Sequence, residues 1–221
     1  MKLPFLLSLA AFTGLAAVHA AEPATAAAAT DFSAFKTADE YWAQIEALQK
    51  PPTEKPATRE EAMTQAKAWF EKQQAANDAF NKAFPADPRR WQARLHSVRI
   101  AMQLGRLAGT APSMDEERKK LDEILNAPDA SATVKGETAF MRAMTYTSEF
   151  KTKPASYIAF HQGVADFMAK YPASPLAAQM QTTQLRVLAD DPTPQGAEVL
   201  KTLAASADAK QADAAKAIIA T

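Results

Sequence analysis

Hydrophobic residues recur at spacings of three and four along most of the chain, which is the period of a helix that buries one face. The first clear stripe lies within residues 38–48 and consists of Ala38, Tyr41, Trp42, Ile45 and Leu48. Thr37 precedes the stripe and Glu40 follows three residues later, which is the pattern of a capping box at the start of a helix. The Pro51-Pro52 pair predicts the end of this helix, because the residue before a proline is disfavoured in the helical region.

Similar stripes recur in six further segments, and two short Ala-rich segments follow them, so we expect an all-α fold of helices packed as antiparallel hairpins. The predicted helices cover residues 58–84, 87–109, 113–127, 131–150, 154–171, 174–190, 196–205 and 208–220. Thr58 with Glu61, and Ser113 with Glu116, form two more capping boxes. No segment has the period-two alternation of a half-buried strand. Five aromatic residues are expected to be mostly buried: Trp42, Trp69, Phe80, Trp91 and Phe167.

One phrase occurs twice, as FNKAFPADP at residues 80–88 and as FMAKYPASP at residues 167–175. In each copy two aromatic residues complete the buried face of a helix, and the first proline stops that helix. Asp87 or Ser174 then caps the next helix, and the second proline occupies its first position, where an amide hydrogen has no helical partner. Two further matches follow the same offset: Gln92 with Gln179, and Arg99 with Arg186. Two interpretations stay open: two related helical hairpins, or two independent uses of the same stop-and-cap chemistry.

Residues 1–20 have the three parts of a secretory signal peptide. Lys2 supplies the positive start, a short apolar run follows, and Val18 and Ala20 are the small residues of a cleavage site. A membrane anchor is the alternative, but it would need about 20 apolar residues. We therefore expect export to the bacterial periplasm or the extracellular space, with no membrane span after cleavage. Residues 21–36 begin as the Ala-rich AEPATAAAATD and are expected to form a flexible tether, ahead of a helical domain over residues 37–221.

Composition excludes several kinds of chemistry. The chain has no cysteine, which rules out disulfides, thiolate nucleophiles, cysteine-based metal sites and a lipid-anchored cysteine after the cleavage point. Lys and Arg together number 25, as do Asp and Glu, so the charge balance gives no reason to expect a nucleic-acid partner. Gly-rich phosphate loops and the G-x-S-x-G and H-E-x-x-H motifs are absent from the sequence.

The histidines are the remaining candidates for catalysis or metal binding. His161 lies on the apolar stripe of Tyr157, Val164 and Met168, and we interpret it as a core residue, because no nucleophile or carboxylate partner is near it in sequence. His96 lies among arginines and is expected to be exposed. We therefore predict no catalytic, cofactor-binding or metal-binding residue, and a chain that is not an enzyme. Catalysis by scattered carboxylates would leave no local pattern in the sequence.

The helix that follows the first copy of the phrase has a strong local charge bias. Between Pro88 and Met114 it has no acidic residue and five arginines: Arg89, Arg90, Arg94, Arg99 and Arg106. One interpretation is a patch that binds an anion or an acidic partner. The other is that the next helix pairs with these arginines and keeps the surface soluble, since exposed pairs contribute about 0.2 to 1 kcal/mol each. That next helix offers five acids: Asp115, Glu116, Glu117, Asp122 and Glu123.

The extended phrases F-x3-FPADPRRWQARL and F-x3-YPASPLAAQM resemble the helical-hairpin junctions of tetratricopeptide-like repeat proteins of the bacterial envelope, where such junctions carry YP-x-SP-x-A. The full W-x2-L-G-x2-Y core of the tetratricopeptide repeat is absent, so the resemblance implies a TPR-like α-hairpin array and no more. The order of signal peptide, Ala-rich tether and proline-punctuated helical block is also similar to the front half of exported TlpA/ResA-like thiol-disulfide proteins of the thioredoxin superfamily. In those proteins a redox domain with W-C-x-x-C follows.

These resemblances imply two functions of different classes. One is a non-catalytic scaffold or interaction module of the cell envelope, whose concave helical surface binds a protein or peptide partner or an adjoining domain. The other is the helical accessory part of a thiol-disulfide oxidoreductase. Because the chain has no cysteine, no redox residue of the second family has a counterpart here.

Overall fold

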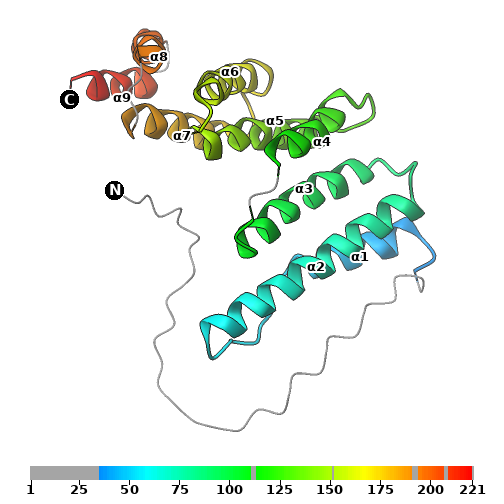
Figure 1. Ribbon diagram of the computed structural model, residues 1–221. Helices are drawn as coiled ribbons and strands as arrows, with labels where there is room; N and C mark the ends of the chain where they lie inside the picture. The colour runs from blue at the N-terminus through cyan, green and yellow to red at the C-terminus, as the bar shows by residue number, and fades with distance from the viewer. Residues whose placement is uncertain (1–34, 111–112, 151, 191–193, 207–208, 221) are drawn as a thin grey trace. The chain divides into compact units, whose positions relative to one another are not determined.

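The computed structural model describes residues 35–110, 113–150, 152–190, 194–206 and 209–220, and every regular element among them is helical (Figure 1). The elements are α1 (Ala38–Leu48), α2 (Arg59–Ala83), α3 (Arg90–Leu107), α4 (Met114–Asn126), α5 (Ala132–Thr145), the 3₁₀ helix η2 (Tyr146–Glu149), α6 (Pro154–Lys170), α7 (Ala177–Asp190), α8 (Pro194–Ala204) and α9 (Ala209–Ile219). The predicted all-α fold is therefore confirmed for the described residues. None of these helices is long and apolar enough to cross a membrane. The predicted signal peptide and residues 21–34 of the predicted tether lie outside the described ranges.

Helices α1 and α2 both start with the predicted capping box. The amide of Glu40 donates to Thr37 Oγ1 at 3.2 Å, and the amide of Thr37 donates to Glu40 Oε2 at 3.2 Å. Thr58 and Glu61 form the same two bonds, at 3.1 and 3.2 Å. Four amides without helical partners are thus satisfied by side chains that lie three residues apart in the sequence.

The predicted capping box at the start of α4 is wrong. Ser113 occupies the N-cap position, but its side chain accepts no capping hydrogen bond. The carboxylate of Glu116 accepts a hydrogen bond from Lys119 Nζ at 2.7 Å. The carboxylate of Glu116 is thus engaged with a lysine of the same helix, and the Ser113 side chain caps nothing.

The predicted helix over residues 131–150 ends earlier than expected, because α5 stops at Thr145 and η2 follows. Three Ser and Thr residues within four positions donate to the carbonyl three residues before them: Thr145 Oγ1 at 2.6 Å, Thr147 Oγ1 at 2.8 Å and Ser148 Oγ at 3.1 Å. Such local bonds compete with α-helical pairing and accompany the tighter winding of a 3₁₀ turn.

Both copies of the repeated phrase fold in the same way. The residue that ends the helix has φ −127° and ψ 60° at Phe84, and φ −131° and ψ 48° at Tyr171. In each copy the polar residue accepts from the backbone amide two positions later, at 2.9 Å for Asp87 Oδ1 and 3.2 Å for Ser174 Oγ. The expectation that Asp87 and Ser174 cap the next helix, with a proline at its first position, is therefore wrong. Both side chains cap a turn, and α3 and α7 begin three residues after them.

Successive helices contact each other along the whole series from α1 to α9. The core consists of four clusters of buried hydrophobic residues, each shared by neighbouring helices. Their members are Tyr41, Trp42, Ile45, Ala76, Phe80 and Ala93 in α1–α3; Leu95, Val98, Leu121, Ile124 and Val134 in α3–α5; Ala143, Phe160, Val164, Phe167 and Met180 in α5–α7; and Tyr157, Leu188, Leu200 and Ala215 in α6–α9. Each helix is thus held mainly by its neighbours in sequence.

The five aromatic residues expected to be mostly buried are all buried or partly buried. Trp69 and Trp91 are the partly buried ones. The indole nitrogen of Trp69 donates to the Leu48 carbonyl at 2.8 Å, and that of Trp91 donates to Asp129 Oδ1 at 2.9 Å. An indole needs an acceptor for its N–H group when the ring is taken out of water, and both rings have one.

Candidate functional site

The five arginines of the predicted patch are not a free positive surface. Arg89 pairs with Asp87 at 2.7 Å and with Asp39 at 2.8 Å. The other ion pairs along α3 are Arg90 with Asp129 at 2.5 Å, Arg94 with Glu123 at 3.5 Å and Arg99 with Glu137 at 3.7 Å. Arg106 is exposed near the end of α3, and it too has an interaction partner.

The acids that neutralise these arginines come mostly from places other than α4. Of the five acids that α4 offers, Glu123 alone is paired with an arginine of α3. The other four bind cations of α4, α5 and α6: Asp115 with Arg118 and Lys153, Glu116 with Lys119, Glu117 with Lys120, and Asp122 with Arg142. The pairing expected from the sequence is therefore present in kind, but most of its acidic partners are different.

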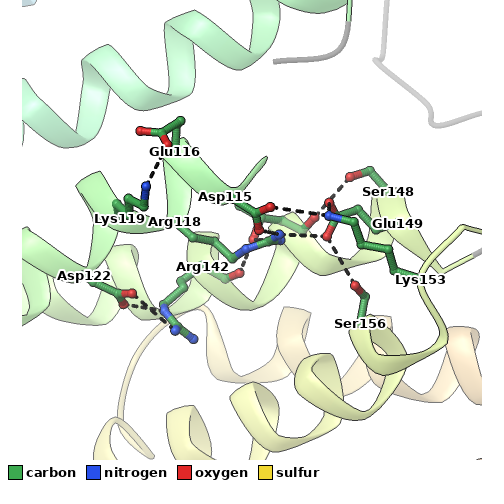
Figure 2. A network of polar contacts seen from close by, with 11 residues as sticks. Asp115, Glu116, Arg118, Lys119, Asp122, Arg142, Ser148, Glu149, Lys153 and Ser156 are labelled. Carbon is green, nitrogen blue, oxygen red and sulfur yellow. Dashed lines mark hydrogen bonds and ion pairs between the residues drawn. The ribbon is translucent and has the colours of Figure 1, made fainter. Parts of the chain in front are cut away.

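A second group of charges is built around Arg118 of α4 and Glu149 of η2 (Figure 2). Their side chains are 9% and 13% exposed, and Arg118 Nη2 lies 2.8 Å from Glu149 Oε2. Lys153 Nζ donates to Glu149 Oε1 at 2.9 Å, and Ser156 Oγ donates to Glu149 Oε2 at 3.2 Å. The guanidinium of Arg118 also lies 4.5 Å from the ring centre of Tyr146. This cluster ties α4 to η2 and the start of α6.

The electrostatics of this cluster fit a structural role. Burial alone would raise the pKa of Glu149, but hydrogen bonds from Lys153 and Arg118 outweigh burial and hold the pKa below its usual value. The carboxylate is therefore ionised and fully engaged near neutral pH. A general acid or base would need a proton that it can exchange near the working pH, and Glu149 offers none.

His161 is buried, as predicted. The centre of its ring lies 4.5 Å from that of Tyr157 and 5.1 Å from that of Phe160, and Nδ1 lies 3.3 Å from the side-chain Nε2 of Gln184. Burial lowers the pKa of His161 to about 4, and its Nε2 has no hydrogen-bond partner among the described residues. The ring is therefore a neutral core group near pH 7.

His96 was expected to be exposed, and this expectation is wrong. The ring is half-buried, with Nδ1 at 3.1 Å from Gln49 Nε2. Burial first, and the positive charge of Arg99 second, lower the pKa of His96 to about 4. Its contact with Gln49, which follows α1, covers part of the ring, and a local stretch of arginines in the sequence did not reveal this contact.

A groove of about 590 Å³ lies at the second copy of the repeated phrase. The corner between α6 and α7 forms one side through residues 170–176, and Gln179 of α7 continues it. Helix α5 contributes Gly136 and Phe140, and Arg99 of α3 also lines the groove. Three segments that are distant in sequence therefore meet at this groove.

The groove is largely apolar and opens to solvent. Phe140, Tyr171 and Leu176 are partly buried members of the third hydrophobic cluster that remain accessible on this side. A Cβ atom on Gly136 would lie 3.5 Å from the Tyr171 ring, so the ring packs directly over the α5 backbone at this glycine. The charged residues of the lining are Arg99, Glu137 and Lys170.

A smaller hollow of about 360 Å³ lies between α2, α3 and α4. Its lining is mostly polar or charged and includes Gln74, Asp78, Arg94, Lys120 and Glu123. Asp78 accepts from Gln74 at 3.0 Å, and the Arg94–Glu123 pair spans the hollow's edge. With its charged groups already paired and little apolar floor, this hollow is a weaker candidate for a binding site than the groove at the second corner.

Comparison with known proteins gives no relatives: no protein family, no curated protein and no solved structure matches the chain. The described residues contain no group of three or more His, Asp or Glu side chains that could hold a metal ion.

Sequence reasoning assigned a structural role to the second corner and did not recognise the groove there. The groove depends on Gly136, Phe140 and Arg99 lying beside residues 170–176, and no local pattern encodes that proximity. The glycine itself was the available signal, because a glycine inside a helix often marks a close approach of another group.

Proposed function

We propose that this protein is a non-catalytic interaction module of the bacterial cell envelope, built as a TPR-like array of α-hairpins and exported across the inner membrane. Its task is to hold an extended segment of a protein partner or of an adjoining domain. Three features support the proposal: the succession of helices that each pack on their sequence neighbours, the closely similar turn geometry at the two corners, and a groove shared by segments distant in sequence. Helical arrays of this kind use their extended surfaces for binding.

The observation that carries the proposal is the groove at the second corner. Its volume of about 590 Å³ lies within the range of about 300 to 1,000 Å³ that is common for binding sites. Its floor is formed by Phe140, Tyr171 and Leu176, and side chains of this kind gain free energy when a partner covers them. The well-defined ion pairs elsewhere on α3 and α4 leave this surface as the best site for a partner.

Selection from a random-peptide display library against the purified chain tests the proposal. Thr133 is exposed and lines the groove in the first turn of α5, so Thr133→Trp should fill the groove without disturbing the core. Thr64 is exposed on α2 and lines neither cavity, so Thr64→Trp is the matched control.

We expect selected peptides that bind the native chain and Thr64→Trp, and that bind Thr133→Trp at least tenfold more weakly, a difference of about 1.4 kcal/mol. Peptides that bind Thr133→Trp as tightly as the native chain would show that the groove is not the binding surface. A selection that yields no binding peptide would remove the support for an interaction module of this kind.

A further inference from the structure

Charge is unbalanced in the groove at the second corner, in contrast to the surfaces beside it. The groove lining contains two cations, Arg99 and Lys170, and one acid, Glu137. Lys170 is exposed at the end of α6 and forms no ion pair with a residue that the structure describes. Arg99 approaches Glu137 at 3.7 Å, with half of its side chain exposed. The groove therefore retains a net positive charge next to an apolar floor.

The neighbouring hollow between α2, α3 and α4 shows the opposite situation. Its two cations, Arg94 and Lys120, are paired with Glu123 at 3.5 Å and with Glu117 at 2.8 Å. Both cations of the hollow are thus paired, whereas in the groove Lys170 has no ion-pair partner among the described residues and lies beside the apolar surface of Phe140 and Tyr171.

We propose that the groove recognises an acidic peptide segment that carries one large apolar side chain. The inference rests on the proposed function and names the chemistry of its partner. The apolar side chain lies on the floor formed by Phe140, Tyr171 and Leu176, and a carboxylate beside it meets Lys170, because Arg99 already pairs with Glu137. The groove volume of about 590 Å³ is enough for one large side chain and the backbone on either side of it.

The two parts of the groove have different energetic tasks. Ion pairs of exposed lysine and arginine contribute little net affinity, because solvent screens them. Burial of the apolar side chain therefore provides most of the affinity, and the charges select acidic over basic partners and speed association. Loss of the apolar side chain should weaken binding strongly, whereas reversal of one charge should change the preference.

Fluorescence anisotropy with three labelled heptapeptides tests this inference on the full chain. The first peptide has a central phenylalanine flanked by Asp and Glu. The second has lysines in place of the acids, and the third has alanine in place of the phenylalanine. We expect the first peptide to bind most tightly, and the second and third peptides to bind roughly tenfold more weakly, or weaker still.

Charge reversal at one lysine provides the matched comparison. Lys170→Glu should weaken binding of the acidic peptide roughly fivefold to tenfold and strengthen binding of the lysine peptide. Lys82 is exposed in the last turn of α2, at the first corner, and lines neither cavity. Lys82→Glu makes the same change of net charge and should leave both affinities within about twofold of the native chain.

These experiments separate the preference for acidic peptides from the location of the binding site. Tighter binding of the lysine peptide, or an equal loss of affinity in Lys170→Glu and Lys82→Glu, would overturn the preference for acidic peptides. If that binding is still weakened by Thr133→Trp, the groove remains the binding site. Binding of none of the three peptides below about 1 mM would also overturn the inference, while the display selection decides separately whether the groove binds peptides at all.

Discussion

Two glycines in neighbouring helices allow a sharp test of how α5, α6 and the second corner pack. Gly136 lies inside α5 and Gly163 lies inside α6. A Cβ atom on Gly136 would meet the Tyr171 ring at 3.5 Å, which is an ordinary van der Waals contact. A Cβ atom on Gly163 would lie 3.1 Å from the Cβ atom of Ala143, which is tighter than carbon atoms normally approach.

Both Gly→Ala changes gain the same helix propensity, about 0.5 to 1 kcal/mol. Gly136→Ala should therefore raise the free energy of unfolding by about that amount. In Gly163→Ala the new methyl group faces Ala143, which is 1% exposed and has no side-chain torsion that could move its Cβ away. The helices must separate slightly, and overpacking of this kind costs about 1 to 3 kcal/mol. Since the propensity gain cancels, Gly163→Ala should be about 1 to 3 kcal/mol less stable than Gly136→Ala.

Urea unfolding followed by far-UV circular dichroism measures this difference. Adding Ala143→Gly to Gly163→Ala restores the space between the helices, and the double variant should show a favourable coupling of about 1 kcal/mol. Equal or greater stability of Gly163→Ala relative to Gly136→Ala would refute the close approach of α5 and α6. A lower stability of Gly163→Ala that shows no coupling to Ala143→Gly would refute the contact between these two residues.

Three further predictions concern the corners, the charge cluster and the buried histidine. Asp87→Ala and Ser174→Ala should each lower the free energy of unfolding by about 0.5 to 2 kcal/mol through the lost turn cap. The larger loss is expected at Asp87, because it also binds the Arg89 side chain at 2.7 Å. Unchanged urea midpoints in both variants would show that the caps contribute nothing. Glu149→Gln should lower the free energy of unfolding by about 2 kcal/mol at pH 7, and this difference should vanish on acidification, because the native pKa of Glu149 lies below its usual value of 4.5 and acid protonates the carboxylate only below it. Glu198→Gln is the control, since Glu198 forms an exposed pair with Lys201 at 2.6 Å. A destabilisation by Glu149→Gln that persists unchanged at low pH would contradict the account. The pKa of His161 is lowered from 6.5 to about 4, so on acidification the unfolded chain takes up a proton on this histidine before the folded chain does. The free energy of unfolding should therefore fall by on the order of 3 kcal/mol between these pH values. His161→Gln should remove this part of the pH dependence between pH 7 and pH 4, and an unaltered pH dependence would show that the ring is not buried.

The helices were predictable because the sequence states them locally. Thr37 and Thr58, each followed by a glutamate three residues later, predict the start of a helix, and both capping boxes form. The same pattern failed at Ser113, whose side chain accepts no capping hydrogen bond, while the Glu116 carboxylate binds Lys119 of its own helix. The sequence shows which residues could form a capping box, and their conformation decides whether the hydrogen bonds form.

The candidate site was not predictable to the same extent, because it depends on distances between segments. The arginines of α3 were visible in the sequence, but their partners Asp39, Asp129 and Glu137 come from α1, the α4–α5 loop and α5. The burial of His96 likewise depends on contact with α1 through Gln49. Local charge and hydropathy describe each helix, and only the packed chain determines which charges remain unpaired.

Amide chemical shifts provide the most direct test of the binding groove. The isotopically labelled chain is titrated with the acidic phenylalanine heptapeptide, and ¹H–¹⁵N correlation spectra are recorded at each step. The account predicts that the largest shift changes fall on Gly136, Phe140, Tyr171 and Gln179, and that Thr133→Trp abolishes them. Changes centred on Ser97 and Lys120 in the neighbouring hollow, or no change at any peptide concentration up to about 1 mM, would contradict the claim that the second corner carries the binding site.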